Sequence, residues 1–193
     1  QFIPYLERYA LTPMLDRSVL ERTLQLMETH PGQSFSVALG QTSLADDGFL
    51  HWLGLRLERA GALAANLWLA FPERVVQALP DAVATLEDYA EQTGVRLMVD
   101  QFGTGGISFD YLARTRLQGV RIGQHYVRDI HRREDARFFL ESMVPVIQQQ
   151  GIKVFISGVE VADEWEVVRS MAVDGIMGFH LSRPQDQPSG ARG

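Results

Sequence analysis

Apolar residues recur along the chain in two patterns, one typical of amphipathic helices and one typical of short buried strands. Residues 15–30 show the first pattern, with apolar side chains on one helical face at Leu15, Val19, Leu20, Leu24 and Met27. The same reasoning predicts helices over residues 49–60, 81–93, 134–150 and 162–171, and a short helix near Tyr111.

The second pattern consists of short apolar runs bounded by turn residues, which predict strands. These runs cover residues 34–39, 66–71, 96–99, 119–122, 152–156 and 175–177. Strands that alternate with helices predict parallel pairing and an α/β fold. Six strands are fewer than the eight of a closed (β/α) barrel, so either two strands are missing from this sequence or the sheet is open.

Local signals refine the ends of two helices. Asp81 is a candidate N-cap, and Gly94 follows the predicted end of the same helix. Pro145 lies inside the helix predicted for residues 134–150, where we expect a kink.

Composition narrows the class of protein. The 193 residues include no cysteine, which excludes disulfides and thiolate metal sites, and the five histidines show no metal-ligand spacing. A net charge of −6 gives no support to nucleic-acid binding. One basic segment, residues 114–137, holds seven of the 18 lysines and arginines. It is either a solvated helix face or a docking patch for a phosphate or an acidic partner.

The limits of the domain are also suggested by the sequence. No apolar run approaches the about 20 residues of a membrane span, and no signal peptide is found. The chain begins with Gln1 and its first residues have the pattern of a domain interior, so we expect a piece of a longer protein. Residues 185–193 are polar and rich in Gly and Pro, which predicts a flexible tail.

Candidate chemistry lies in the sequence V-D-Q-F-G at residues 99–103. Asp100 follows an apolar strand and precedes a glycine-rich loop, and α/β barrels carry their active sites at such strand ends. The neighbouring Gln101 is neutral, so this strand end supplies one carboxylate.

These residues, together with other motifs, make the chain resemble the EAL domain, the cyclic di-GMP phosphodiesterase family of bacteria. The matching segments are F-I-P-Y-L-E-R-Y-A-L at 2–11, F-G-T-G at 102–105, Y-V-R-D-I at 126–130, G-V-E at 158–160 and S-R-P at 182–184. The resemblance implies a modified TIM barrel over residues 1–184, N-terminally incomplete. It further implies that the N-terminal hairpin strands, with the Glu-Ala-Leu signature, lie upstream of Gln1.

The resemblance implies two-metal hydrolysis of a phosphodiester by Mg²⁺ or Mn²⁺, but this chain departs from the family at most of the metal- and water-binding positions. The residues found at those positions are Ala38, Ala70, Gln101, Arg121, Gly123, Ser157 and Met177. Asp100, Glu73 and Glu160 are retained. Alanine offers no ligand atom, and the methionine thioether does not suit magnesium. We therefore expect a degenerate domain with no catalytic residues, no bound metal and no cofactor.

The retained acidic residues also have a purely structural interpretation. In this interpretation Asp100 serves only as a cap for loop amides, and Glu73 and Glu160 organise loops rather than act in catalysis.

Two non-enzymatic functions follow from the resemblance, and an active phosphodiesterase ranks behind both. The first is a regulatory module that senses cyclic di-GMP and relays it through protein interaction. The second is a nucleotide-independent docking platform, as in the inactive GGDEF–EAL regulators of small-RNA turnover by ribonuclease E. Ligand contacts would come from Phe2, Ile3, Pro4, Asp100, Arg121, Arg183 and Pro184.

The expected partners are cyclic di-GMP, a protein, and a second copy of the chain in a homodimer. No direct contact with nucleic acid or a membrane is expected, and the expected location is the cytoplasm, including the cytoplasmic part of a membrane-anchored parent. A last expectation is that Arg121 occupies the space of the lost metal ions and forms an ion pair with Asp100, because a guanidinium can bond a carboxylate through two nitrogens.

Overall fold

The computed structural model describes residues 12–106 and 108–181. The predicted tail and five of the expected ligand contacts (Phe2, Ile3, Pro4, Arg183 and Pro184) lie outside the described residues. The chain divides into two compact units, Gln1–Gln118 and Gly119–Gly193, which we call the first and the second unit.

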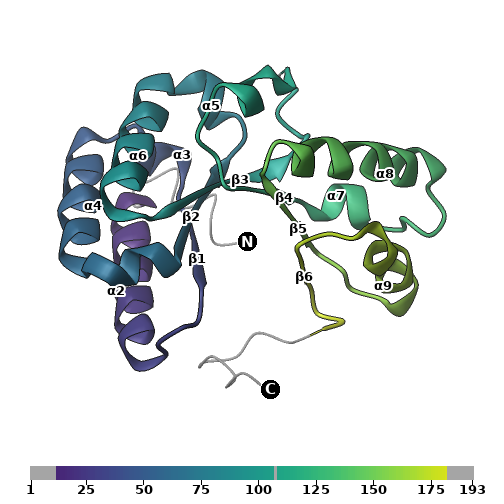
Figure 1. The fold of residues 1–193 in the computed structure, drawn as a ribbon, viewed down its shortest axis with the longest axis horizontal. Helices are drawn as coiled ribbons and strands as arrows, with labels where there is room; N and C mark the ends of the chain where they lie inside the picture. Colours follow the sequence, from purple (N-terminus) through teal and green to yellow (C-terminus); the bar gives the residue numbers. More distant parts are fainter. Residues whose placement is uncertain (1–11, 107, 182–193) are drawn as a thin grey trace. The chain divides into compact units, whose positions relative to one another are not determined.

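The first unit is a three-stranded parallel sheet with helices packed beside it. Its longer elements are α2 (Thr12–Thr29), β1 (Phe35–Ala38), α4 (Asp47–Ala60), β2 (Leu67–Pro72), α6 (Pro80–Thr93) and β3 (Arg96–Phe102). Its short helical turns are α3 (Gln41–Leu44), η1 (Gly61–Asn66), α5 (Val75–Ala78) and η2 (Phe109–Ala113). The strands pair in the order β1-β2-β3, and α2, α4 and α6 lie on the same side of them (Figure 1).

The second unit repeats this plan with three further parallel strands. Its strands are β4 (Gly119–Ile122), β5 (Lys153–Ser157) and β6 (Gly175–Met177), paired in this order. Its helices are α7 (Gln124–Val127), α8 (Glu134–Gln149), α9 (Ala162–Val168) and η3 (Arg169–Met171). The parallel pairing confirms the α/β class that the sequence predicts.

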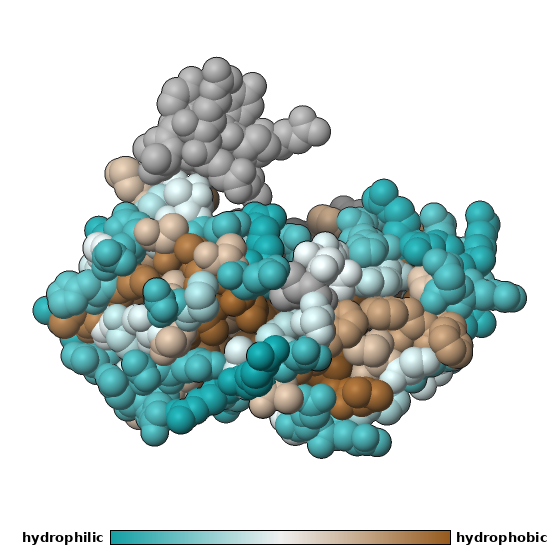
Figure 2. All heavy atoms as spheres, turned by 90° about the horizontal axis from the view of Figure 1, so that it is seen from above, coloured by the Kyte–Doolittle hydropathy of each residue, from teal (hydrophilic) through white to brown (hydrophobic). Residues whose placement is uncertain are grey.

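The core follows the apolar pattern of the sequence. Leu20, Leu24 and Met27 of α2 are buried, as their spacing predicts, but Leu15 and Val19, expected on the same face, are exposed. In β2, Leu67, Leu69 and the residues beside them are buried on both faces of the strand, which is typical of parallel sheets covered by helices. Each such leucine contributes roughly 1.5–3 kcal/mol of transfer free energy. Other apolar side chains remain exposed among polar ones, as on the face shown in Figure 2.

Two predicted boundaries are wrong. The α6 helix has Leu79 at its N-cap position and Pro80 in its first turn, so Asp81 lies inside the helix instead of capping it. Proline favours the first helical position because its fixed φ suits a helix and it has no N–H to satisfy. The strand expected to end at residue 99 continues to Phe102, because Pro72 of β2 pairs with Asp100.

Two other predictions at helix ends have mixed outcomes. Gly94 follows α6 in the left-handed conformation, with φ of 76°, as its place in the sequence indicates. The α8 helix continues through Pro145 to Gln149, and the kink expected there stays a prediction. No helix in the described part of the chain is long and apolar enough to cross a membrane.

Candidate functional site

In the first unit the candidate residues gather where the parallel strands end. Ala38 of β1 is level with Ala70 of β2, and Pro72 of β2 is level with Asp100 of β3. Ala38 is exposed, whereas Ala70 is completely buried. Because parallel strands present their carboxyl ends at one edge of a sheet, these positions form one surface. The two alanines offer no polar side-chain atom to it.

Asp100 is the half-buried carboxylate at this edge, and its Oδ1 accepts a hydrogen bond of 2.8 Å from the Gln101 backbone N–H. Gln101 has a φ of 55°, which is uncommon for a residue other than glycine, and its side chain is exposed. Its carbonyl accepts bonds from the backbone N–H and the hydroxyl of Thr104. The contact of Asp100 with a loop amide agrees with the structural interpretation of this residue, as a cap for loop amides.

Glu73 follows β2 and is turned into the glycine-rich loop. It is only 2% exposed, and its Oε2 accepts from the Gly105 N–H at 2.7 Å while its Oε1 accepts from the Tyr111 hydroxyl at 2.8 Å. A Cβ at residue 105 would lie 2.8 Å from Glu73 Oε2, so glycine is needed for this approach. Both carboxylate oxygens are thus used to hold the loop after β3.

Tyr111 is the residue of this arrangement that sequence reasoning missed. Burial, and then the charge and the hydrogen bond of Glu73, raise the pKa of its hydroxyl well above the usual value. The raised pKa keeps the Tyr111 hydroxyl protonated, so that it donates its hydrogen bond to Glu73. It lies 38 residues from Glu73 in sequence, and the only signal available was its place in the helix after the glycine-rich loop.

In the second unit the candidate residues again lie at or just after strand ends. Arg121 is half-buried on β4 and Gly123 follows that strand. Ser157 of β5 is level with Met177 of β6, and the Ser157 hydroxyl donates to the Ile122 carbonyl at 3.1 Å. That hydroxyl already has a backbone acceptor, and the Met177 side chain is exposed.

Glu160 lies in the loop after β5 and is exposed. Its Oε1 accepts a hydrogen bond of 2.8 Å from the Gln124 side chain at the start of α7. The nearby Glu164 is buried and accepts from the backbone N–H groups of Asp129 and Glu160. These contacts connect the loop after β5 to α7, and neither Gln124 nor Glu164 was singled out from the sequence.

The arrangement offers few metal ligands. Among residues 12–106 and 108–181, no group of three or more His, Asp or Glu side chains is placed to hold a metal ion. Asp100 belongs to the first unit and Arg121 to the second, so their expected ion pair stays a prediction.

Comparisons with known proteins support the fold and the family. Vibrio cholerae LapD S helix-GGDEF-EAL, bound to c-di-GMP, has the same fold with a TM-score of 0.85 and 22% identity, over 94% of this chain and 45% of that chain. This likeness confirms the expected α/β fold of the modified TIM barrel type.

Curated relatives match at similar levels. Cyclic di-GMP phosphodiesterase NbdA of Pseudomonas aeruginosa is 28% identical over 146 residues, which are 76% of this chain and 18% of NbdA. RNase E specificity factor CsrD of Escherichia coli is 22% identical over 191 residues, 96% of this chain and 29% of CsrD. The chain thus spans less than a third of either relative. The family model of the EAL domain matches residues 1–184, and the chain belongs to the EAL domain family.

Proposed function

We propose that this chain is a catalytically inactive EAL domain that acts as a regulatory module, sensing cyclic di-GMP and relaying its presence through protein interaction. The observation that carries this proposal is the set of side chains at the strand ends. In the first unit the carboxyl ends of the strands carry two alanines and the carboxylate of Asp100. The other acidic residue, Glu73, accepts hydrogen bonds from the Gly105 N–H and the Tyr111 hydroxyl with its two oxygens.

A pair of divalent ions does not fit this set of donors. Mg²⁺ and Mn²⁺ prefer several oxygen ligands in near-octahedral geometry. Ala38 and Ala70 supply none, and the Ser157 hydroxyl, a weak neutral ligand, is bonded to a backbone carbonyl. Asp100 alone cannot neutralise two dications, so we assign this chain no metal-dependent step and no resident cofactor.

Binding of cyclic di-GMP requires fewer protein groups than its hydrolysis, because no metal ion has to be held. Phosphates can be held by guanidinium groups and backbone amides without metal. The likeness to LapD, whose structure is described as bound to c-di-GMP, supports a sensing function because that protein has the same fold. Arg121 and Asp100 are the described residues that would contact the ligand, together with the residues at 2–4 and 183–184.

The second candidate function is a protein-docking platform that neither hydrolyses nor binds cyclic di-GMP. It is favoured by the similarity to CsrD, an RNase E specificity factor, over 96% of the chain. In that case the strand ends would serve only to shape loops, as Glu73 does with Tyr111.

One pair of measurements tests the proposal. The domain is titrated calorimetrically with cyclic di-GMP in the presence of EDTA, and its hydrolysis is followed by chromatography with Mg²⁺ or Mn²⁺ added. We expect saturable binding without metal and no linear product. Linear product formed in proportion to enzyme would overturn the assignment as inactive, and absence of binding would favour the docking platform.

A further inference from the structure

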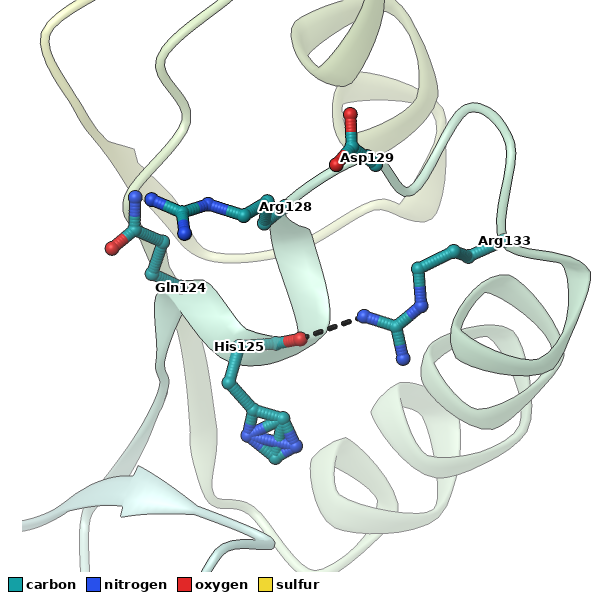
Figure 3. Close-up of a pocket in the computed structure, with 5 residues that line it drawn as sticks. All are labelled: Gln124, His125, Arg128, Asp129 and Arg133. Carbon is teal, nitrogen blue, oxygen red and sulfur yellow. Dashed lines mark hydrogen bonds between the residues drawn. The ribbon is translucent and has the colours of Figure 1, made fainter.

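The basic segment at residues 114–137 does not gather its charges at one place. In the first unit Arg116 is ion-paired with a glutamate of α6, and in the second unit Arg133 donates to the His125 carbonyl at 2.9 Å. Figure 3 shows the guanidinium groups of Arg128 and Arg133 pointing to different sides of the hollow beside α7. These arginines therefore fit the solvated surface that one of the two interpretations predicts.

A second hollow, which we call the apolar groove, lies within the first unit and has a volume of ≈ 270 Å³. One wall runs from the end of α3 to the first turns of α4, and the other from the end of α5 to the first turns of α6. Its floor is formed by the buried residues Leu44, Leu50 and Ala82, and the exposed Ala45 and Ala78 lie at its rim. An apolar side chain that enters the groove is thus removed from water, which favours binding.

Contacts between α4 and α6 fix the walls of the apolar groove. The Tyr89 hydroxyl on α6 donates to the Leu50 carbonyl on α4 at 3.0 Å. One turn further along α4, a Cβ at Gly54 would lie 2.7 Å from the Tyr89 ring, so glycine is needed for the close approach of the two helices. Because the walls are held by these contacts, little conformational entropy has to be lost when a partner binds.

The charge of the apolar groove is negative. Asp47 in the first turn of α4 and Asp81 in the first turn of α6 line opposite walls, and both are exposed. Within the described part of the chain neither carboxylate has a hydrogen-bond or ion-pair partner, and no Arg, Lys or His lines the groove. Arg74 lies before α5 and donates to the Gln41 side chain instead. The helix dipoles offset only about half a charge at each helix start, so cations are favoured at both walls.

The start of α6 adds a feature that suits a polypeptide. Leu79, at the N-cap position, makes no side-chain hydrogen bond, and Pro80 after it has no N–H. The next N–H groups, those of Asp81 and Ala82, therefore lack a capping side chain at this position. A backbone carbonyl of a bound chain can accept from them, whereas a hydrocarbon cannot.

We propose that the apolar groove binds a segment of a partner protein in which leucine-like side chains are flanked by arginine or lysine. The apolar side chains contact the floor, and the cationic side chains pair with Asp47 and Asp81. The inference rests on the proposed function in one respect, because it names a surface for the protein interaction that both candidate functions share. None of the strand-end positions assigned to cyclic di-GMP lines this groove.

The test is a titration of the ¹⁵N-labelled chain with the peptide acetyl-Arg-Ala-Leu-Leu-Ala-Arg-amide at constant ionic strength, followed by amide chemical shifts. We expect saturable shifts confined to residues 44–50 and 78–85. Asp47→Asn and Asp81→Asn should each weaken binding about threefold, the loss of one exposed charge pair. Asp88→Asn is the matched control and should have no effect, because Asp88 is exposed on α6 and does not line the groove.

A second pair of variants tests the apolar floor. Ala78→Phe should abolish saturation, because the ring fills the groove without changing its charge. Ala84→Phe is the matched control, since Ala84 is exposed on α6 and does not line the groove. Peptides in which serine replaces both leucines, or aspartate replaces both arginines, should not bind.

The outcomes separate this inference from the proposed function. Cyclic di-GMP is titrated in parallel, and its binding should be the same in Asp81→Asn as in the wild type. Absence of peptide saturation in a chain that binds cyclic di-GMP would overturn this inference alone, whereas peptide binding without cyclic di-GMP binding would support it and refute the sensing function. Equal weakening by Asp88→Asn would also overturn it. The same shifts on concentrating the chain without peptide would assign the groove to a second copy and overturn it too.

Discussion

Asp16 is a carboxylate on α2 with only 6% of its surface exposed. Its Oδ2 accepts hydrogen bonds from the Gly40 N–H at 2.7 Å and from the Ser43 hydroxyl at 2.6 Å, so it connects α2 to the loop after β1. Burial raises the pKa of this carboxyl above the usual 3.8, against the lowering effect of the two hydrogen bonds. Folding therefore favours the neutral form of Asp16 relative to the unfolded chain.

The first prediction concerns the pH dependence of Asp16→Asn. The pKa of Asp16 is higher in the folded state than in the unfolded chain, so burying its ionised form lowers the free energy of unfolding. This loss of stability is absent below about pH 3.8 and increases as the pH rises through the pKa of the folded state. The stability of Asp16→Asn relative to the wild type should therefore increase from pH 4 to pH 7, as measured by urea unfolding at each pH.

A second variant separates the charge of Asp16 from its hydrogen bonds. Asp16→Ala leaves the Gly40 N–H and the Ser43 hydroxyl without their acceptor, so it should be less stable than Asp16→Asn by about 1–3 kcal/mol at every pH. A difference between Asp16→Asn and wild type that stays constant or decreases with pH would contradict the prediction.

At the scale of elements, the loop after β6 is packed too closely for any side chain at Gly178. A Cβ at this position would lie 2.0 Å from the Val159 carbonyl oxygen, which belongs to the backbone and cannot rotate away. The same carbonyl accepts from the His180 N–H at 3.2 Å. The close approach therefore holds the loop after β6 against the loop after β5.

We predict that Gly178→Ala destabilises the protein by about 3 kcal/mol or more, because the backbone must move. Thermal unfolding measures the loss, and hydrogen exchange should show a less protected His180 N–H. Gly151→Ala is the matched control: its Cβ meets nothing within 4 Å, and only the φ of 77° is unfavourable, at about 1 kcal/mol. Equal effects of the two variants would refute the packing argument.

The elements also show which parts of the fold a sequence can predict. The helices with several turns and all six strands were found, because their apolar spacing reflects burial on one face or on both. The short helices α3, α5 and α7 were missed, because four residues make a single helical turn and cannot show the repeated spacing of apolar residues that reveals a longer helix. The location of Asp100 near a strand end was predictable. The contact of Glu73 with Tyr111 was not, because 38 residues separate them and only the folded loop brings them together.

At the scale of the whole molecule, the proposed loss of activity is a property of a set of residues and not of one position. Two dications at a site need several anionic ligands at once, because each ion must be both neutralised and desolvated. Ala38→Asn or Ser157→Glu alone should therefore restore neither Mn²⁺ binding in calorimetry nor hydrolysis of cyclic di-GMP. Hydrolysis by either single variant would show that the remaining residues already hold a metal.

The last prediction concerns the variant in which Ala38→Asn, Ala70→Glu and Gln101→Asp, all in the first unit, are combined. Ala70 is completely buried, so an ionised glutamate there has to be desolvated and has no cation beside it unless metal binds. The combined variant should unfold at a lower temperature than the wild type in EDTA, and Mn²⁺ should raise its unfolding temperature because a ligand that binds only the folded state stabilises it. The wild type and both single variants should show no such rise. A combined variant that is insensitive to Mn²⁺ would mean that these three positions cannot hold a metal ion together, and the proposed origin of the inactivity would then be wrong.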